Sequence, residues 1–313
     1  MAAKHYILAF CLFPLLGCVE EIELDLPEVE AQLVVLSNFT VDQELEVSVA
    51  RTRSAVSDAV EPFLYYTNAD VRLWRGLDEL ETLELIIPED ERQTPFYRTD
   101  GFEPVVGVAY TIKVNVEGFD EVMATSIIPR PVAISAVELQ SSIRSGRTED
   151  ESQLSFQVAV SFQDPPGEAN FYHLRFFQEL SRYRIEGVDT IVNPATTIRE
   201  PLVVSATSDE LPFLPDGNDQ GILIRDDVLD GLLNTFRFEG SLVYNSQLYL
   251  PGNFLIELRS VSKEYYDFHA SVARQQNSDG PFSSGIDLKD NIGNGVGSFA
   301  GFNTNTSTVL IHR

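Results

Sequence analysis

The chain contains very little cysteine, and all of it lies near the N-terminus. Its 313 residues include two cysteines, Cys11 and Cys18. The region after Cys18 therefore has no cysteine nucleophile, no CxxC redox motif and no cysteine-ligated metal. Basic residues are also scarce, with 22 Lys and Arg against 48 Asp and Glu and a net charge of −26. Because nucleic-acid binding needs a positive surface, we exclude that class of partner.

The sequence also lacks an apolar run long enough to cross a bilayer as a helix. Lys4 precedes a short apolar core that ends at Leu16, and this core matches the middle of a signal peptide. The four residues that follow the pattern of a bacterial lipobox are Leu15, Leu16, Gly17 and Cys18. We predict that residues 1–17 are a lipoprotein signal peptide and that Cys18 is the lipidated first residue of the mature protein. The alternative is an ordinary secretory signal in which the cysteine is incidental.

Residues 18–30 are predicted to form an acidic tether behind this anchor. Glu20, Glu21 and Glu23 follow the cysteine directly. They resemble the signal that sends lipoproteins of the Bacteroidota phylum to the outer face of the outer membrane, which predicts a lipid-anchored protein at the cell surface. The alternative is that these charges only keep the tether solvated and extended. The overall acidity disfavours a protein that lies flat on an anionic bilayer.

Short alternating apolar runs separated by Gly, Pro and polar residues predict a mainly β protein. Residues 31–130 resemble an immunoglobulin-like or transthyretin-like sandwich. Its expected strands include residues 32–36, 45–49, 69–74, 94–97, 110–116 and 122–127. Two prolines at 129 and 131 predict a domain boundary, because proline stiffens the chain and blocks ladder pairing.

Residues 132–313 are predicted to form a second β-rich domain with one helix. Expected strands cover residues 154–162, 172–177, 254–259 and 307–311, and a turn is expected at 164–167. The helix is predicted near residues 261–273, with Ser262 as its cap and with Tyr265, Phe268 and Val272 on one face. Residues 180–220 are polar and interrupted by prolines, so we expect long loops there, where binding often resides.

The C-terminal region resembles a lipoprotein family known as domain of unknown function 4249. The resemblance rests on a strand followed by Ser262 to Phe268, then Gly280-Pro281-Phe282, then the glycine-rich segment Asn291 to Phe299. Asp227 to Gly231 also fits. Members of this family are outer-membrane lipoproteins of the Bacteroidota, often encoded beside TonB-dependent receptor barrels. The resemblance implies an accessory role and carries over no catalytic residue.

Few residues suggest chemistry. None of His173, His269 and His312 shows a metal-ligand spacing, and we expect none of them to be a ligand. No GxSxG nucleophile motif occurs, and residues 295–300 fit G-x-G-x-x-A without the strand and helix that a dinucleotide site requires. A weak calcium-loop pattern places Asp216, Asn218 and Asp227 as candidate ligands, against the simpler reading of an acidic surface turn. We predict no catalytic residues and no cofactor.

These observations favour a non-enzymatic binding protein at the cell surface. The leading prediction is an accessory subunit of a TonB-dependent, SusC-like transporter. A second possibility is a free-standing adhesion or ligand- and glycan-capture module, which would have no stable barrel partner. A third is a calcium-dependent glycan-binding protein or hydrolase.

Overall fold

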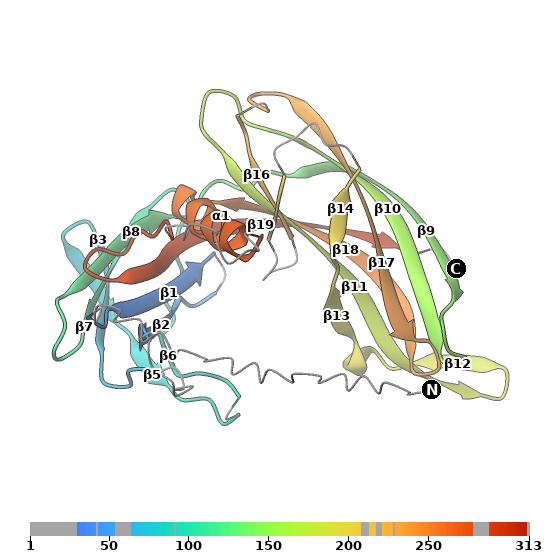
Figure 1. Ribbon diagram of the computed structural model, residues 1–313, viewed down its shortest axis with the longest axis horizontal. Helices are drawn as coiled ribbons and strands as arrows, with labels where there is room; N and C mark the ends of the chain where they lie inside the picture. The colour runs from blue at the N-terminus through green and yellow to red at the C-terminus, as the bar shows by residue number, and fades with distance from the viewer. Residues whose placement is uncertain are drawn as a thin grey trace, which may run out of the picture.

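The computed structural model describes residues 30–41, 43–53, 64–90, 92–207, 213–216, 221–227, 229–277 and 288–311. The predicted signal peptide, Cys18 and the tether up to residue 29 lie outside these ranges. The described chain is mainly β with one α-helix, which confirms the predicted fold class. No helix in these ranges is long and apolar enough to cross a membrane. Two β-rich bodies stand side by side, with α1 close to where they meet (Figure 1).

The first body is a sandwich of two sheets. One sheet has the order β4-β3-β7-β8, and it faces the β19-β1-β2-β6-β5 part of a longer sheet. The strands are β1 (Leu33–Phe39), β2 (Glu46–Arg51), β3 (Asp70–Arg75), β4 (Asp78–Thr82), β5 (Glu84–Ile86), β6 (Phe96–Arg98), β7 (Ala109–Asn115), β8 (Val122–Ile127) and β19 (Val296–Leu310). Alternating apolar residues such as Val71, Leu73 and Ile112 fill the space between the sheets, because successive side chains of a strand point to opposite faces.

The second body is also a sandwich, built from longer strands. A four-stranded sheet has the order β14-β17-β10-β9 and packs on the β15-β16-β11-β18-β19 part of the long sheet. The strands are β9 (Ile134–Ser145), β10 (Glu151–Gln163), β11 (Phe171–Glu186), β14 (Val204–Ala206), β15 (Leu214–Asp216), β16 (Gly221–Arg225), β17 (Leu233–Asn245) and β18 (Tyr249–Val261). Buried aromatic rings, among them Phe156, Phe176 and Phe238, dominate this core.

Strand β19 joins the two bodies. Its first half pairs in parallel with β1, and its second half pairs antiparallel with β18. The sequence places this segment in the second domain, whereas in the structure Ile292 and Phe299 pack in the core of the first body. Gly297 has φ +128°, and a Cβ there would lie 2.0 Å from the carbonyl oxygen of Val35. The glycine-rich tail therefore lets β19 pass close to the first sandwich.

Helix α1 (Lys263–Asn277) confirms the predicted helix, which begins two residues later and ends four residues later than expected. The Ser262 hydroxyl accepts a hydrogen bond from the backbone N–H of Tyr265 at 3.3 Å, as its predicted capping role requires. The expected buried face was only partly right. Tyr265 is buried, but Tyr266, Ala270 and Ala273 are buried with it in place of Phe268 and Val272. The helix therefore turns a different face to the sheet than the one expected, and Ala270 packs there with Tyr265 and Tyr266.

The prediction of long loops over residues 180–220 is wrong for most of this segment, because much of it forms β-strands. Strand β11 continues to Glu186 and turns into β12 (Asp189–Val192), and a 3-10 turn (Pro194–Thr196) and β13 (Ile198–Pro201) follow. The prolines misled the prediction because they occupy the places where β structure tolerates them. Pro194 opens the 3-10 turn, and Pro215 lies on the edge strand β15.

Candidate functional site

The outer face of the four-stranded sheet carries an unusual concentration of uncharged polar side chains. Along β10, the inward positions are apolar, and the outward ones from residue 153 to 161 are polar except for Ala159: Gln153, Ser155, Gln157 and Ser161. This alternation puts polar groups on the solvent side of a strand whose other side is core. The neighbouring strands follow the same pattern, so the polar residues of three strands share one face.

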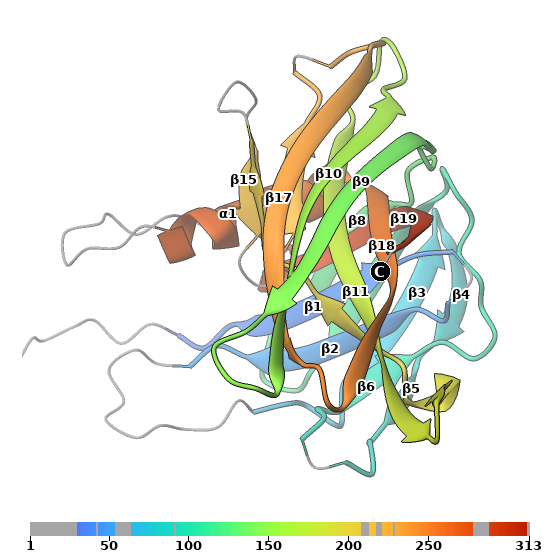
Figure 2. The same ribbon diagram turned by 90° about the vertical axis from the view of Figure 1, so that its right-hand side faces the viewer.

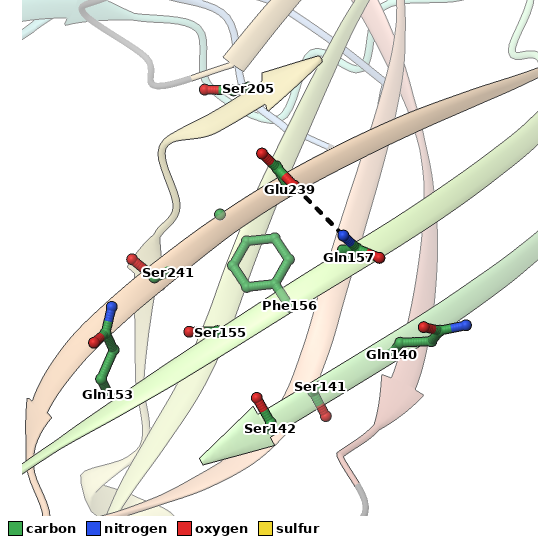
Figure 3. A pocket seen from close by; sticks show the side chains of 11 residues that line it. Gln140, Ser141, Ser142, Gln153, Ser155, Phe156, Gln157, Ser205, Glu239 and Ser241 are labelled. Atoms are coloured by element: carbon green, nitrogen blue, oxygen red, sulfur yellow. Dashed lines mark hydrogen bonds between the residues drawn. The ribbon is translucent and has the colours of Figure 1, made fainter. Parts of the chain in front are cut away.

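The register of the sheet aligns these side chains in rows across the strands. Gln157 lies beside Gln140 of β9 and Glu239 of β17. Ser205 of β14 pairs in turn with Glu239 and extends this row to the fourth strand. The next row joins Ser142, Ser155 and Ser241. Figure 3 shows the amides and hydroxyls projecting from these strands.

A hollow of about 600 Å³ lies over these rows. A smaller hollow of about 230 Å³ shares Gln140 and Gln157 with it, so the two adjoin along the face of β10. Gly240 and Phe156 also line the larger one. The two are paired across β17 and β10, and a Cβ at Gly240 would lie 2.7 Å from Cζ of Phe156, so the glycine makes room for this buried ring. We call this feature the polar groove.

The chemistry of the polar groove is that of recognition by hydrogen bonds. Each glutamine amide offers donors and acceptors, and each serine hydroxyl can act as either. Gln157 Nε2 donates to a Glu239 carboxylate oxygen at 3.5 Å, which leaves the other groups of the groove free to contact a ligand. Among the described residues, Glu239 is the one charged side chain that lines the larger hollow, whereas Glu138 and Arg237 line the smaller one. The larger hollow therefore suits an uncharged, hydroxyl-rich or amide-rich ligand.

A second cluster of polar residues lies on the outer face of the long sheet, beneath α1. His173 of β11 is fully buried, and its Nδ1 lies 3.0 Å from the hydroxyl oxygen of Tyr265. Asp216 of β15 is 1% exposed. Its Oδ2 lies 3.2 Å from Nδ1 of His269 and 3.9 Å from Nε2 of His173. We call these four residues the histidine cluster.

Further charges border the histidine cluster. Glu257 of β18 lies between Arg175 and Arg259, with N–O distances of 3.6 and 3.5 Å. Nη1 of Arg259 also lies 3.4 Å from the Tyr265 hydroxyl. The chain makes room for His173 at Gly221, where a Cβ would lie 2.3 Å from the His173 Nε2. The four residues of the histidine cluster thus come from β11, β15 and α1, and residues of β16 and β18 border it.

Burial sets the charge state of His173. Removal from water, followed by the positive charges of Arg259 and Arg175, lowers the pKa of its imidazole well below 6.5, while Asp216 opposes that shift. The imidazole is therefore neutral in the folded protein at neutral pH. The Nε2 atoms of both His173 and His269 are buried without a hydrogen-bond partner in the described chain. His173 and Asp216 are buried between α1 and the sheet, and His269 is 14% exposed at the edge of the cluster.

The structure describes two of the three candidate calcium ligands, Asp216 and Asp227. Asp216 faces the two histidines, and Asp227 forms an ion pair with Arg225. Asn218 and His312 lie outside the described residues. Within those residues, no group of three or more His, Cys, Asp or Glu side chains is arranged to hold a metal ion. His173 and His269 were expected not to be metal ligands, and no spacing in the sequence indicates that their side chains lie close together.

Comparison with known protein families shows to which family the chain belongs. A model of the family described as a domain of unknown function, DUF4249, matches residues 19–308. The match covers most of the chain, so the protein belongs to this family, as the C-terminal segment had indicated. No curated protein matches the chain.

The polar groove was missed from the sequence. The alternation along residues 153–161 predicts a half-buried strand and hence an outward polar face. However, that pattern is local, whereas the groove needs the rows contributed by β9 and β17. The glutamines and serines at outward positions of the expected strands are the sequence signal that could have indicated a polar binding face.

Proposed function

We propose that the protein is a non-enzymatic, surface-exposed lipoprotein of the outer membrane that captures an uncharged polar ligand in the polar groove. Its expected place is beside a TonB-dependent transporter, as an accessory subunit. The observation that carries the binding role is the row Gln140, Gln157 and Glu239, which lies open along a hollow of about 600 Å³. Pockets of this size suit small ligands and short oligomers.

Two further features support the location and the partner. The lipobox that ends at Cys18 predicts a lipid anchor, and the acidic residues behind it favour the cell surface. The expectation that members of the family are often encoded beside TonB-dependent receptor barrels favours a transporter partner. A free-standing capture module remains the second candidate, because the polar groove would serve it equally well.

The binding role is tested by electrophoresis in gels that contain soluble neutral polysaccharides, with the mature chain as the sample. A ligand that fits the polar groove slows the migration of the wild-type protein. The double variant Gln140→Ala/Gln157→Ala should lose this retardation. The matched control is Thr111→Ala/Thr125→Ala. It removes two hydroxyl groups from the outer face of the first sandwich, whose oxygens lie 2.7 Å apart. Equal retardation of both variants would refute a role for the groove.

The accessory role is tested by capture of the tagged lipoprotein from outer membranes in mild detergent, followed by mass spectrometry. A TonB-dependent barrel recovered in stoichiometric amount supports the proposal. Recovery of the lipoprotein alone, in several detergents, favours the free-standing module. Labelling with radioactive palmitate, which Cys18→Ser should abolish, tests the lipid anchor independently of any partner.

A further inference from the structure

The β11–β12 hairpin extends beyond the body of the second sandwich and ends in exposed aliphatic side chains. Figure 1 and Figure 2 both place it at the lower edge of the molecule. Its turn is Gly187-Val188, with Gly187 at φ +68°. Val188 is 99% exposed and Ile185 67%. Aliphatic side chains so fully exposed at a projecting tip are a costly arrangement in water unless something covers them.

The two faces of the hairpin differ in character. Cross-strand pairs set Tyr183 beside Val192 and Ile185 beside Thr190, so one face carries no charge. The other face carries Arg184, Glu186 and Asp189. The Nε atom of Arg184 lies 2.6 Å from Oε1 of Glu186, and Asp189 pairs with Glu186 across the two strands. A hydrogen bond of 2.8 Å from the Tyr183 hydroxyl to the backbone oxygen of Ser246 fixes the base of the hairpin to the β17–β18 turn. The hairpin is therefore amphipathic and firmly attached.

The charge of this region departs from that of the whole chain. Between residues 180 and 200, arginines and acidic residues occur in equal number, in a protein whose net charge is −26. The β3–β4 hairpin provides a comparison with nearly the same turn sequence. There Gly76-Leu77 has Gly76 at φ +60° and Leu77 95% exposed, but strand β4 brings the acidic residues Asp78, Glu79 and Glu81. A second apolar tip is thus present; Arg75 pairs with Asp78 at its turn, and the acidic residues Glu79 and Glu81 follow along β4.

We propose that the β11–β12 hairpin inserts its tip, Ile185 and Val188, into the interface of the membrane to which the protein is anchored. The inference rests on the proposed lipid anchor at Cys18. Residues 18–30 reach at most about 45 Å when fully extended, so the anchored protein stays within that distance of the bilayer. An uncharged hairpin face with protruding Ile and Val side chains matches the boundary between headgroups and acyl chains. The hairpin gives the anchored protein a second point of contact and hence a fixed orientation.

The contact is with zwitterionic lipid. The acidic surface of the protein is repelled by an anionic bilayer, whereas the charge-balanced hairpin gains nothing from anionic headgroups. Binding through it should accordingly depend little on salt and should weaken when phosphatidylglycerol is added. This behaviour differs from that of a basic peripheral protein.

The test is flotation of the chain from residue 19 onward, which keeps every described residue and lacks the lipid anchor, with phosphatidylcholine vesicles. The wild type should float with the vesicles. Ile185→Asp/Val188→Asp should bind at least about tenfold more weakly, because aliphatic area is replaced by charge. Leu77→Asp, the matched control at the other hairpin tip, should bind like the wild type. Unchanged thermal unfolding of all three proteins would show that the folds are intact.

A fluorescence measurement gives a second test. In a Trp74→Phe background, Val188→Trp should shift its emission to the blue when phosphatidylcholine vesicles are added and should be quenched by brominated acyl chains. Leu77→Trp in the same background should do neither. Absence of wild-type flotation, equal flotation of the two aspartate variants, or a hairpin-dependent dimer in solution would overturn the membrane assignment. Palmitate labelling of the full-length protein reports separately on the anchor.

Discussion

The two outer faces of the second sandwich differ in whether their polar residues are exposed to water or buried. The face of the four-stranded sheet leaves glutamines and serines open to water in the polar groove, with Glu239 the one charged residue lining the larger hollow. The face of the long sheet buries the histidine cluster, with its aspartate and the neighbouring arginines, beneath α1. Uncharged groups on an open face cost little and stay available to a ligand. Buried ionisable groups must find partners within the protein, so they hold α1 in place.

The strongest test of this difference removes the acidic member of the histidine cluster. Asp216→Ala should lower the free energy of unfolding by about 2–4 kcal/mol, because it removes the buried carboxylate that lies 3.2 Å from His269 Nδ1 and beside the buried ring of His173. Urea unfolding followed by circular dichroism measures the change. Glu239→Ala on the open face should stay within about 0.5 kcal/mol of the wild type. Similar losses in the two variants would contradict the distinction between the faces.

The histidine cluster also predicts a pH dependence of stability. Burial lowers the pKa of His173 well below 6.5 in the folded state, and the unfolded chain restores it to about 6.5. The folded protein then binds fewer protons than the unfolded one below that pH. This difference should lower the free energy of unfolding by up to about 1.4 kcal/mol for each pH unit below 6.5 and should vanish above about pH 7.5.

The matched variant for this pH dependence is His173→Asn, which has no proton to bind in this range. Unfolding curves of wild type and variant, taken every half unit from pH 7.5 to 5, isolate the share of His173 from that of the many carboxylates. The two proteins should converge as the pH falls. Parallel curves over the whole range would show that His173 does not titrate on unfolding.

The smallest expected effect concerns the polar groove. Gln157→Ala removes an exposed side chain whose one described hydrogen bond, to Glu239, is 3.5 Å long. Its effect on the free energy of unfolding should lie within about 0.5 kcal/mol, as for ordinary surface positions. Retardation in polysaccharide gels should nevertheless fall, since Gln157 belongs to both hollows. If Gln157→Ala unfolded more easily but bound as well as the wild type, this face would contribute to stability and not to binding, which would contradict the proposal.

The sequence by itself determined the local elements. Alternation along residues 154–162 predicts a half-buried strand, and β10 covers it. The spacing of apolar residues after Ser262 predicts the helix and its cap, both of which are present. The C-terminal motif that indicated the family also consists of residues that are close together in the chain, and the prediction of a lipobox at Cys18 rests on the same kind of signal. Such features depend on periodicity and motifs, which are properties of short segments.

Only the tertiary structure decided what these elements build. The parallel pairing of β1 with β19 joins the two ends of the described chain, and no local pattern specifies that partner. The extension of β11 to Glu186 was hidden by its polar and charged residues, which become exposed toward the end of the strand. His173, Asp216 and His269 meet because three separate elements converge, and the polar groove exists because register aligns outward residues of adjacent strands. Register and packing are set by contacts between distant segments, so the sites that they create cannot be read from any one of those segments.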